Sequence, residues 1–293
     1  MRDLQRGVFE IIKLVSRFMG SDKRQSDQTM PANCLPAFRW AGGKRRLLSQ
    51  IVPLLPKKYN HYYEPFCGGA ALFFHLRPSI ATLGDKNEDL INCYRQVKNR
   101  CEDVIDVLQG FKNTKRNYYE IRKANPQDRV ERAARFIYLV ELSFNGLYRV
   151  NKDGNFNVPY GYKTKKKFDF DQIRYASKAL ADVKLVHGDF ETTVAQAQAG
   201  DLIYFDPPYT VAHGNNGFVQ YNEKIFSWDG QLRLARLANE LADRGCIVVI
   251  SNAEHSSIKS IYGNFTSHAV TRHSGIGAAA AARKHISEFV FTK

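Results

Sequence analysis

The sequence predicts an α/β protein with a doubly wound, mostly parallel sheet that is interrupted by a helical insertion. Short apolar runs typical of strands, each ending in a polar or glycine-rich turn, alternate with helical patterns over most of the 293 residues. The segment from about 111 to 179 breaks this alternation, because it is helical and loop-like, basic and aromatic. Ligands of doubly wound sheets bind beyond the carboxyl ends of the strands, so residues that follow the apolar runs are candidate site residues.

Residues 1–34 precede this pattern. Apolar residues recur at helical spacing from Val8 to Met19, and the polar stretch 20–34 is typical of a linker. We therefore expect residues 1–34 to form a helical extension and its linker. The charged residues Glu10 and Lys13 interrupt the apolar stretch, which argues against a signal peptide.

The remaining elements follow in chain order. Predicted strands lie within 61–69, 81–85, 183–189, 201–209, 246–252, 265–270 and 285–292. Helical spacing is clear over 89–99 and 229–245. These predictions divide the chain into a core domain, residues 35–110 and 180–293, and an inserted recognition domain, residues 111–179.

The charge balance indicates a polyanionic partner. The chain carries 43 Lys+Arg against 29 Asp+Glu, which gives a net charge of +14. Residues 112–167 alone hold 14 basic and 5 acidic residues, with aromatic residues between them. Basic side chains contact phosphates and aromatic rings stack on bases, so the mixture favours nucleic acid over an anionic membrane.

The cysteines and the hydropathy pattern exclude other classes of protein. The five cysteines show no C-x-x-C spacing, which argues against a zinc site and a disulfide framework and predicts a reducing, cytoplasmic compartment. We see no metal constellation and expect no metal. No run of about 18 apolar residues occurs, so we expect no membrane partner.

Two glycines and an acid predict a nucleotide-like pocket. Gly68 and Gly69 follow the first predicted strand, where they would let the backbone approach a ligand closely. Asp85 ends the next strand, at the distance where such folds place a ribose-binding acid. An ordinary turn and a helix-capping aspartate are the alternatives. Upstream, Trp40 and Lys44 in "FRWAGGKRRLL" suit a ligand that bears a carboxylate.

The stretch "DLIYFDPPY" predicts chemistry on an amino group. Asp206 follows an apolar strand, and Pro207 and Pro208 make the next turn stiff while adding no backbone N–H. An adenine or cytosine amino group becomes nucleophilic when acceptors hold its two hydrogens, as the Asp206 carboxylate and the Pro207 carbonyl could. Tyr209 could stack on the base, which must first leave the duplex. A strand-ending turn with a capping aspartate is the alternative.

These motifs, with "FNGLYRVNKDGNFNVPYGYK" at 144–163, make the chain similar to the Dam-type (alpha-class, D12) DNA adenine N6-methyltransferases from about residue 35 onward. The resemblance implies a Rossmann-like fold that binds S-adenosylmethionine, and methyl transfer to a flipped-out adenine in double-stranded DNA. It also implies that the core domain is catalytic. Family members often recognise GATC, and the sequence leaves open whether this chain works alone or beside a restriction nuclease.

The resemblance assigns roles to residues of this sequence. It implies cofactor binding by Trp40, Lys44, Gly68, Asp85 and Asp206, and catalysis by Asp206, Pro207 and Tyr209. It implies that DNA contacts come from Phe144, which would wedge into the base stack, and from Asn145, Leu147 and Arg149.

The chain departs from the family at three places. Ala70 stands where many members have another glycine, residues 1–34 match nothing typical of the family, and residues 274–285 are rich in alanine, which leaves contacts from Arg283 or Lys284 open. Three alternatives also remain: methylation of RNA, methylation of cytosine amino groups, and a DNA-binding module without catalysis. For Arg149 the alternative is a phosphate contact, and residues 163–167 are expected to face phosphates or solvent.

Overall fold

The computed structural model describes residues 36–210, 226–273 and 285–293. The predicted N-terminal extension, residues 1–34, therefore lies outside the described residues, as do Arg283, Lys284 and the alanine-rich stretch 278–282. All of the described residues fall in one compact unit.

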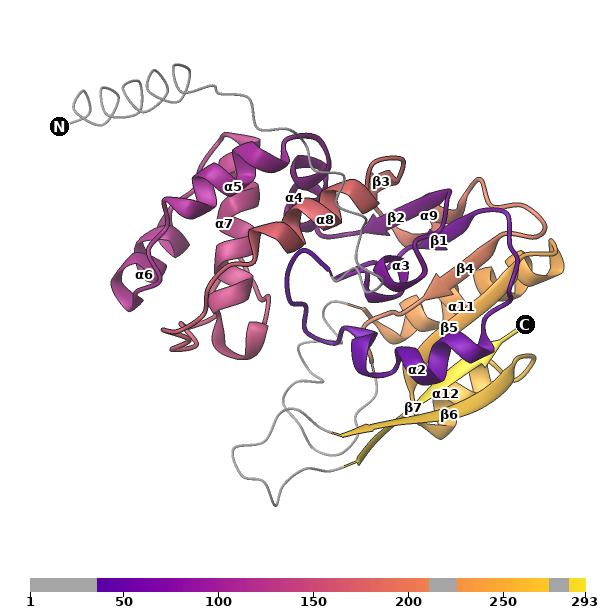
Figure 1. Cartoon of the computed structure of the whole chain (residues 1–293). Coiled ribbons are helices and arrows are strands. Elements are labelled where there is room, and N and C mark those ends of the chain that lie inside the picture. Colours follow the sequence, from indigo (N-terminus) through magenta and orange to yellow (C-terminus); the bar gives the residue numbers. More distant parts are fainter. Residues whose placement is uncertain (1–35, 211–225, 274–284) are drawn as a thin grey trace. The chain divides into compact units, whose positions relative to one another are not determined.

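The described residues form a seven-stranded sheet with the order β3-β2-β1-β4-β5-β7-β6 (Figure 1). The strands are β1 (Tyr62–Glu64), β2 (Ala81–Asp85), β3 (Lys184–His187), β4 (Leu202–Phe205), β5 (Ile247–Ala253), β6 (Thr266–His273) and β7 (His285–Thr292). The first five strands are parallel, whereas β7 runs antiparallel to both β5 and β6. The predicted doubly wound, mostly parallel fold is confirmed.

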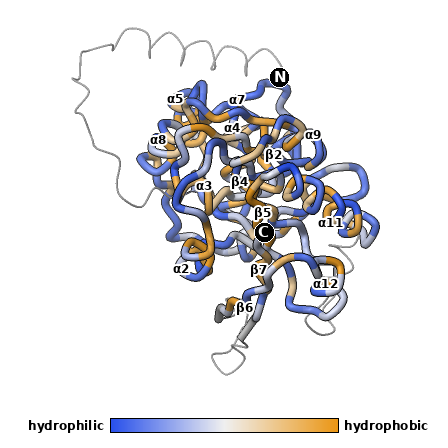
Figure 2. The backbone as a smooth tube through the Cα atoms, turned by 90° about the vertical axis from the view of Figure 1, so that its right-hand side faces the viewer, coloured by the Kyte–Doolittle hydropathy of each residue, from blue (hydrophilic) through white to orange (hydrophobic). Residues whose placement is uncertain are grey.

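The chain order reverses between β1 and β4. From β1 the chain proceeds through β2 to β3 on one side, and it then returns to place β4 and β5 on the other side. Such a reversal leaves a crevice at the carboxyl ends of the two central strands. Figure 2 shows hydrophobic segments in the middle of the molecule, and all four residues of β4 are buried, as expected for a strand covered on both faces.

Several of the helices begin at a polar side chain that caps the first turn. They are η1 (Lys44–Arg46), α2 (Leu48–Ile51), η2 (Val52–Leu54), α3 (Ala71–Leu76), α4 (Glu88–Asn99), α5 (Cys101–Gln109), α6 (Lys115–Lys123), α7 (Arg129–Leu142), η3 (Phe144–Gly146), α8 (Phe170–Ala179), α9 (Phe190–Val194), α11 (Trp228–Asp243) and α12 (Ser256–Ile261). Side chains of Asn87, Thr114 and Asp128 accept hydrogen bonds from backbone N–H groups in the first turn of α4, α6 and α7.

The predicted insertion packs closely on the helices that precede it. Helix α7 contacts both α4 and α5, and it is buried along most of its length. Helix α8 also packs on α4 and α5. The boundary at residue 111 stays a prediction, because α4 and α5 share the apolar core of the inserted helices. Within the described part of the chain, no helix is both long enough and apolar enough to cross a bilayer.

Candidate active site at the carboxyl ends of the central strands

Three acids stand at the carboxyl ends of three adjacent parallel strands. Glu64 ends β1, Asp85 ends β2, and Asp206 directly follows β4. Strand β1 lies between the other two, so Glu64 lies between the two aspartates. Burial, together with the charges of both aspartates, raises the pKa of Glu64 to about 8, although a hydrogen bond from the Tyr62 hydroxyl opposes that shift. Neighbouring buried acids with a raised pKa are typical of a functional site.

The turn after β1 is built around Gly68. Its φ is +46°, in the left-handed region that favours glycine, and its N–H donates to the Asp85 carboxylate at 3.0 Å. The Asn87 N–H donates to the other carboxylate oxygen at 2.9 Å, and the Tyr94 hydroxyl donates to the Gly68 carbonyl. Burial raises the pKa of Asp85, while these backbone donors lower it. The turn and the acid predicted from the sequence are therefore in direct contact.

Trp40 covers this glycine turn. A Cβ atom added to Gly68 would lie 2.6 Å from Trp40 Nε1, and one added to Gly69 would lie 2.7 Å from Trp40 Cβ. The indole also stacks on Phe136 and on Tyr148, with ring centroids 6.0 and 5.6 Å apart. Trp40 thus joins the candidate cofactor site to the inserted helices.

A second cluster surrounds Asp206, and we call Lys44, Asp206, Tyr209 and Glu288 the catalytic corner. The Lys44 ammonium lies 2.6 Å from Asp206 Oδ1 and 3.6 Å from Glu288 Oε2. The Tyr209 hydroxyl donates to Glu288 Oε2 at 2.5 Å, and the ammonium lies 4.9 Å from the centre of the Tyr209 ring. Burial, and then the nearby carboxylates of Asp206 and Glu288, raise the pKa of Tyr209.

The turn of Pro207 and Pro208 is fixed from outside the corner. The Gln231 side chain, fully buried on α11, donates to the Pro208 carbonyl at 3.4 Å and to Thr210 Oγ1 at 3.1 Å. Asn252 on β5 donates to the same glutamine at 3.0 Å. The turn after Asp206 is therefore held by a helix and by a neighbouring strand.

The predicted DNA-contacting residues lie at the end of α7. Phe144 is 52% exposed, and Asn145, beside it in η3, has a left-handed φ of +55°. Leu147 is half-buried, and Arg149 is exposed, with its Nε donating to Asn157 Oδ1 at 2.7 Å. The structure thus presents the four predicted residues on one largely exposed segment, which is distant in sequence from Asp206.

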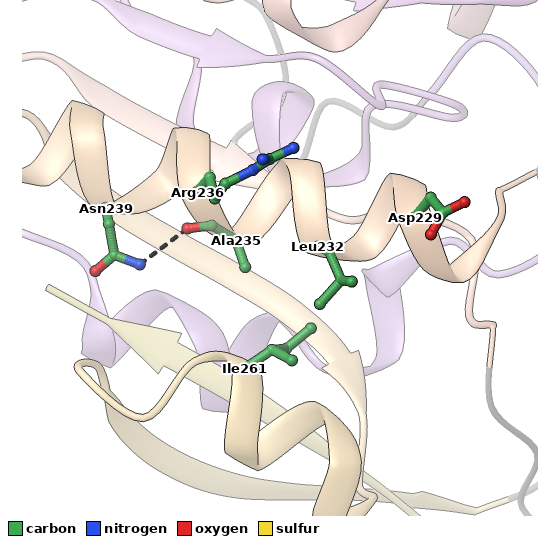
Figure 3. Close-up of a pocket in the computed structure, with 6 residues that line it drawn as sticks. All are labelled: Asp229, Leu232, Ala235, Arg236, Asn239 and Ile261. Carbon is green, nitrogen blue, oxygen red and sulfur yellow. Dashed lines mark hydrogen bonds between the residues drawn. The ribbon is translucent and has the colours of Figure 1, made fainter.

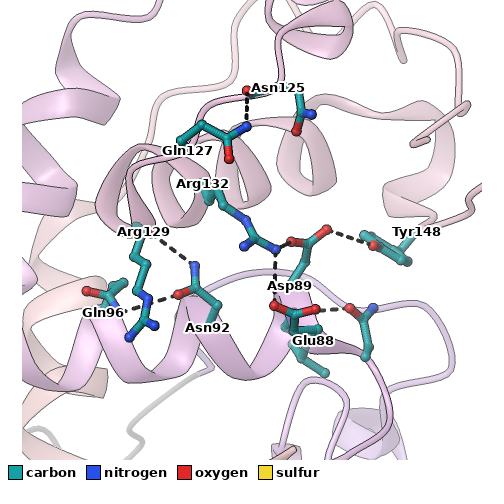
Figure 4. A network of polar contacts seen from close by, with 11 residues as sticks. Glu88, Asp89, Asn92, Gln96, Asn125, Gln127, Arg129, Arg132 and Tyr148 are labelled. Carbon is teal, nitrogen blue, oxygen red and sulfur yellow. Dashed lines mark hydrogen bonds and ion pairs between the residues drawn. The ribbon is translucent and has the colours of Figure 1, made fainter. Parts of the chain in front are cut away.

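A polar network attaches this segment to α4 (Figure 4). Arg132 on α7 lies 2.7 Å from Asp89 and 3.5 Å from Glu88, at the start of α4. The Tyr148 hydroxyl donates to Asp89 at 3.4 Å, and its ring stacks on Trp40. The start of α4, only a few residues after Asp85, therefore touches the segment that holds the predicted DNA contacts.

Two buried carboxylates of the site are absent from the sequence prediction. Glu64 lies inside the quoted motif "YEPFCGG", where the glycines were the feature interpreted. Glu288 lies in the strand "HISEFVFT", two residues before the fully buried Val290 and therefore on the same face of β7. This position in the alternation predicts a buried glutamate, but the sequence does not say which side chains it meets.

One surface hollow lies away from these residues. An open pocket of about 580 Å³ lies between α11 and α12, and Figure 3 shows the residues that line it: Asp229, Leu232, Ala235, Arg236, Asn239 and Ile261. None of the predicted site residues lines this pocket. The described residues also contain no group of three or more His, Cys, Asp or Glu side chains that could hold a metal ion.

Comparison with known proteins gives one consistent family. The family described as D12 class N6 adenine-specific DNA methyltransferase matches residues 40–276. M1.LlaDCHI, a type II methyltransferase of Lactococcus lactis subsp. cremoris, is 41% identical over 271 residues, which cover 89% of this chain and 95% of that protein. M.MjaIII, a type II methyltransferase of Methanocaldococcus jannaschii, is 39% identical and covers 74% of this chain and 84% of that protein.

A third relative is the DNA adenine methylase of Escherichia coli (strain K12). It is 30% identical over 259 residues, which cover 86% of this chain and 93% of that protein. The family match includes every site residue predicted from the sequence, from Trp40 to Tyr209. Glu288 lies beyond the matched residues.

Proposed function

The chain belongs to the D12 class of N6 adenine-specific DNA methyltransferases, and we propose that it methylates a flipped-out adenine in duplex DNA with S-adenosylmethionine as the donor. The observation that carries this proposal is the catalytic corner. There a carboxylate at the end of β4, a stiff double-proline turn and an anchored tyrosine stand together. These are the acceptors and the aromatic face that an adenine amino group needs.

The residues around the glycine turn fit the proposed cofactor. Asp85 is an acceptor suited to ribose hydroxyls, and a carboxylate can accept more hydrogen bonds than the two backbone N–H groups supply. Gly68 and Trp40 would border the same site. S-adenosylmethionine supplies an electrophilic methyl group on a positively charged sulfur.

Lys44 has a place in this proposal beside Asp206. Its ammonium has three N–H donors, of which Asp206 and the Gly42 carbonyl take two. The third can serve Glu288 or the carboxylate at the methionine end of the cofactor. Whether Lys44 binds the cofactor, as the family resemblance implies, stays a proposal. In either case it places a positive charge against the carboxylate that receives the adenine amino group.

The proposed chemistry balances within this corner. The Asp206 carboxylate accepts one amino hydrogen and the Pro207 carbonyl accepts the other, which directs the nitrogen lone pair toward the methyl group. The N6 atom would then bond to the methyl carbon that bound S-adenosylmethionine would supply, with the electron pair of the broken sulfur–carbon bond left on sulfur. The surplus proton on N6 passes to Asp206 and then to water. Such a site acts by positioning and by acceptor geometry, without a covalent enzyme intermediate.

Further parts of the proposal concern the DNA. We propose that Phe144 wedges into the stack while Asn145, Leu147 and Arg149 contact the target bases, with GATC as the site to test first. The type II methyltransferases among the relatives support a restriction nuclease as a partner. DNA as substrate also makes the cytoplasm of a bacterial or phage-infected cell the proposed place of action.

The test uses labelled S-adenosylmethionine, unmethylated duplex DNA and the Asp206→Ala variant. We expect the wild type to place label in N6-methyladenine at one short site, and Asp206→Ala to lose methyl transfer while it remains folded. Asp243→Asn, which removes an exposed carboxylate on α11, is the matched control and should keep full activity. Near-normal activity of Asp206→Ala would contradict the proposed mechanism.

Digestion of the labelled nucleic acid to nucleosides, followed by identification of the labelled base, distinguishes the alternatives. Label in N4-methylcytosine, or transfer to RNA in place of DNA, would identify cytosine or RNA as the substrate. The proposed role of the catalytic corner would still hold. Cofactor binding without transfer to any nucleic acid would indicate a DNA-binding module whose catalysis has been lost.

A further inference from the structure

Glu288 reaches the catalytic corner from a strand that runs against the rest of the site. In the register of β5 and β7, Glu288 pairs with Ala253 at the carboxyl end of β5. Strand β5 lies next to β4, which delivers Asp206. Because β7 is antiparallel, a residue near its beginning lies at the edge where the parallel strands end. The topology therefore brings this carboxylate to the proposed active-site edge.

The carboxylate is fully buried, and it contacts two members of the corner. Its Oε2 accepts the Tyr209 hydroxyl at 2.5 Å and lies 3.6 Å from the Lys44 ammonium. A buried charge is costly unless it is paired and hydrogen-bonded. Glu288 thus depends on Tyr209 and Lys44 for its stability, and both of these side chains are oriented by it in turn.

Orientation matters most for the tyrosine. Tyr209 is half-buried, and its hydroxyl, at the tip of the ring, is held by Glu288. A ring fixed at its tip and by its backbone has a defined plane. Stacking on a flipped base requires such a plane, and misplacement by about 1 Å can cost roughly a hundredfold in rate. The same oxygen keeps Lys44 within reach of Asp206.

We infer that Glu288 is a positioning residue for methyl transfer, which orients the Tyr209 ring and the Lys44 ammonium without touching the adenine or the methyl group. This inference rests on the proposed function. It predicts an effect on the chemical step that exceeds the effect on binding of either substrate. A glutamate that only stabilised the sheet would affect folding and binding instead.

The test measures steady-state methylation of duplex DNA by Glu288→Gln and Glu288→Ala, with Asp243→Asn as a matched carboxylate control. We expect Glu288→Ala to lower kcat by roughly a hundredfold, because the ring and the ammonium lose their common anchor. Dissociation constants for S-adenosylmethionine and DNA should change by less than about threefold, the usual size for a residue that contacts neither ligand. Glu288→Gln should recover part of kcat, since its amide oxygen still accepts from Tyr209.

A double-mutant cycle with Tyr209→Phe separates positioning from stability. Tyr209→Phe removes the hydroxyl through which Glu288 holds the ring. Adding Glu288→Gln to Tyr209→Phe should therefore lower kcat further by no more than about threefold. Fully additive losses would overturn the inference. So would a kcat within about twofold of wild type in both Glu288 variants.

The remaining outcomes are distinguishable. A loss of activity that is matched by a lower melting temperature and lost cofactor binding in both Glu288 variants would assign the residue to folding and overturn the inference. If the wild type itself transfers no methyl group to DNA, the proposed function fails, and the inference fails with it. Active wild type with active Glu288 variants overturns the inference alone.

Discussion

Gly68 is a residue at which a single methyl group should disturb the candidate cofactor site. Its left-handed φ of +46° disfavours any side chain, and a Cβ would lie 2.6 Å from the Trp40 indole. We expect Gly68→Ala to weaken S-adenosylmethionine binding at least about tenfold and to lower the free energy of unfolding by about 1–3 kcal/mol. Calorimetric titration and urea unfolding measure the two effects.

Gly154 is the matched control for that substitution. Its φ is +78°, but no atom lies within 4 Å of an added Cβ. Gly154→Ala should therefore show backbone strain alone, of roughly 1 kcal/mol, with cofactor affinity unchanged. Equal loss of cofactor affinity in both variants would contradict the close contact between the turn and Trp40.

Glu64 makes the stability of the protein depend on pH. Its pKa in the folded protein is about 8, against an ordinary value of 4.5. The folded protein therefore keeps a proton that the unfolded chain releases between these values. The contribution of this protonation to the free energy of unfolding is complete below about pH 4. It is lost as the pH rises toward 8, at up to roughly 1.4 kcal/mol per pH unit.

Glu64→Gln tests this dependence, because the amide cannot titrate yet still accepts from the Tyr62 hydroxyl. We expect the free energy of unfolding of the wild type to fall relative to that of Glu64→Gln between about pH 5 and pH 8. Urea unfolding at several pH values gives the comparison. Parallel pH curves for the two proteins would contradict a raised pKa.

Sequence reasoning at the residue scale gives its most specific prediction where a motif combines unusual residues. The chemistry of the run Asp206-Pro207-Pro208-Tyr209 alone predicts a rigid turn that offers hydrogen-bond acceptors. Glu288 has no such neighbours, and its partners come from sequence positions 44 and 209. A single glutamate in an apolar strand indicates burial, but only the strand order shows what it is buried against.

At the scale of one element, α3 ends in an unfavourable conformation. Arg77 follows the helix with φ +48° and ψ +56°, and its N–H donates to the Phe73 carbonyl. A non-glycine residue there costs about 1–2 kcal/mol, part of which is offset because glycine has a larger entropy in the unfolded chain. We expect Arg77→Gly to raise the free energy of unfolding by about 0.5–1 kcal/mol.

Arg236 provides the opposite case for the same substitution. It is exposed within α11, where the backbone is helical. Arg236→Gly should lower the free energy of unfolding by about 1 kcal/mol, because glycine weakens a helix interior. Chemical unfolding of the two variants in parallel tests the pair, and stabilisation by both or by neither would contradict the reasoning.

Elements with strong periodicity were predicted closely, whereas those bounded by turns were not. Helix α11 matches the spacing predicted over 229–245, and it ends just before Gly245, whose φ is +91°. Of the run 61–69, only Tyr62–Glu64 forms a strand, because Gly68 and Gly69 turn the chain toward α3. Apolar residues around a glycine turn look the same in sequence whether they extend a strand or pack beneath the turn.

At the scale of the whole molecule, the net charge of +14 predicts DNA contacts of two kinds, sequence-specific and non-specific. Arg149 is exposed, and a guanidinium carries five N–H donors, so its bond to Asn157 leaves donors for a base. We expect Arg149→Ala to relax sequence preference by about 1–3 kcal/mol at one position. Competitive binding to DNA with single-base changes measures this loss.

Lys165 is the matched control for a phosphate contact. It is exposed in the basic run at 163–167. Lys165→Ala should weaken binding to all sequences alike and reduce the salt slope by about 1, as expected for a phosphate contact. Uniform weakening by Arg149→Ala as well would contradict base reading and favour the phosphate alternative.

The parallel sheet could be predicted from the alternation of strands and helices along the chain, but the order of its last strands could not. The parallel sheet follows from strands that alternate with helices, and the charge of 112–167 marks the insertion. The position of β7 between β5 and β6 follows no pattern in the sequence, since it depends on which edge the last strands join. The close packing of α7 on α4 and α5 likewise arises from tertiary contacts.

The reversed strand β7 also affects the order in which the protein matures during synthesis. The ribosome makes residue 288 after every other member of the catalytic corner, so a nascent chain that has reached β5 already holds Lys44 and Asp206 but has no anchor for Tyr209. We expect such a chain to have its parallel sheet and its glycine turn before it has an oriented tyrosine. We therefore expect methylation by such an unfinished chain to be slow until β7 has joined the sheet.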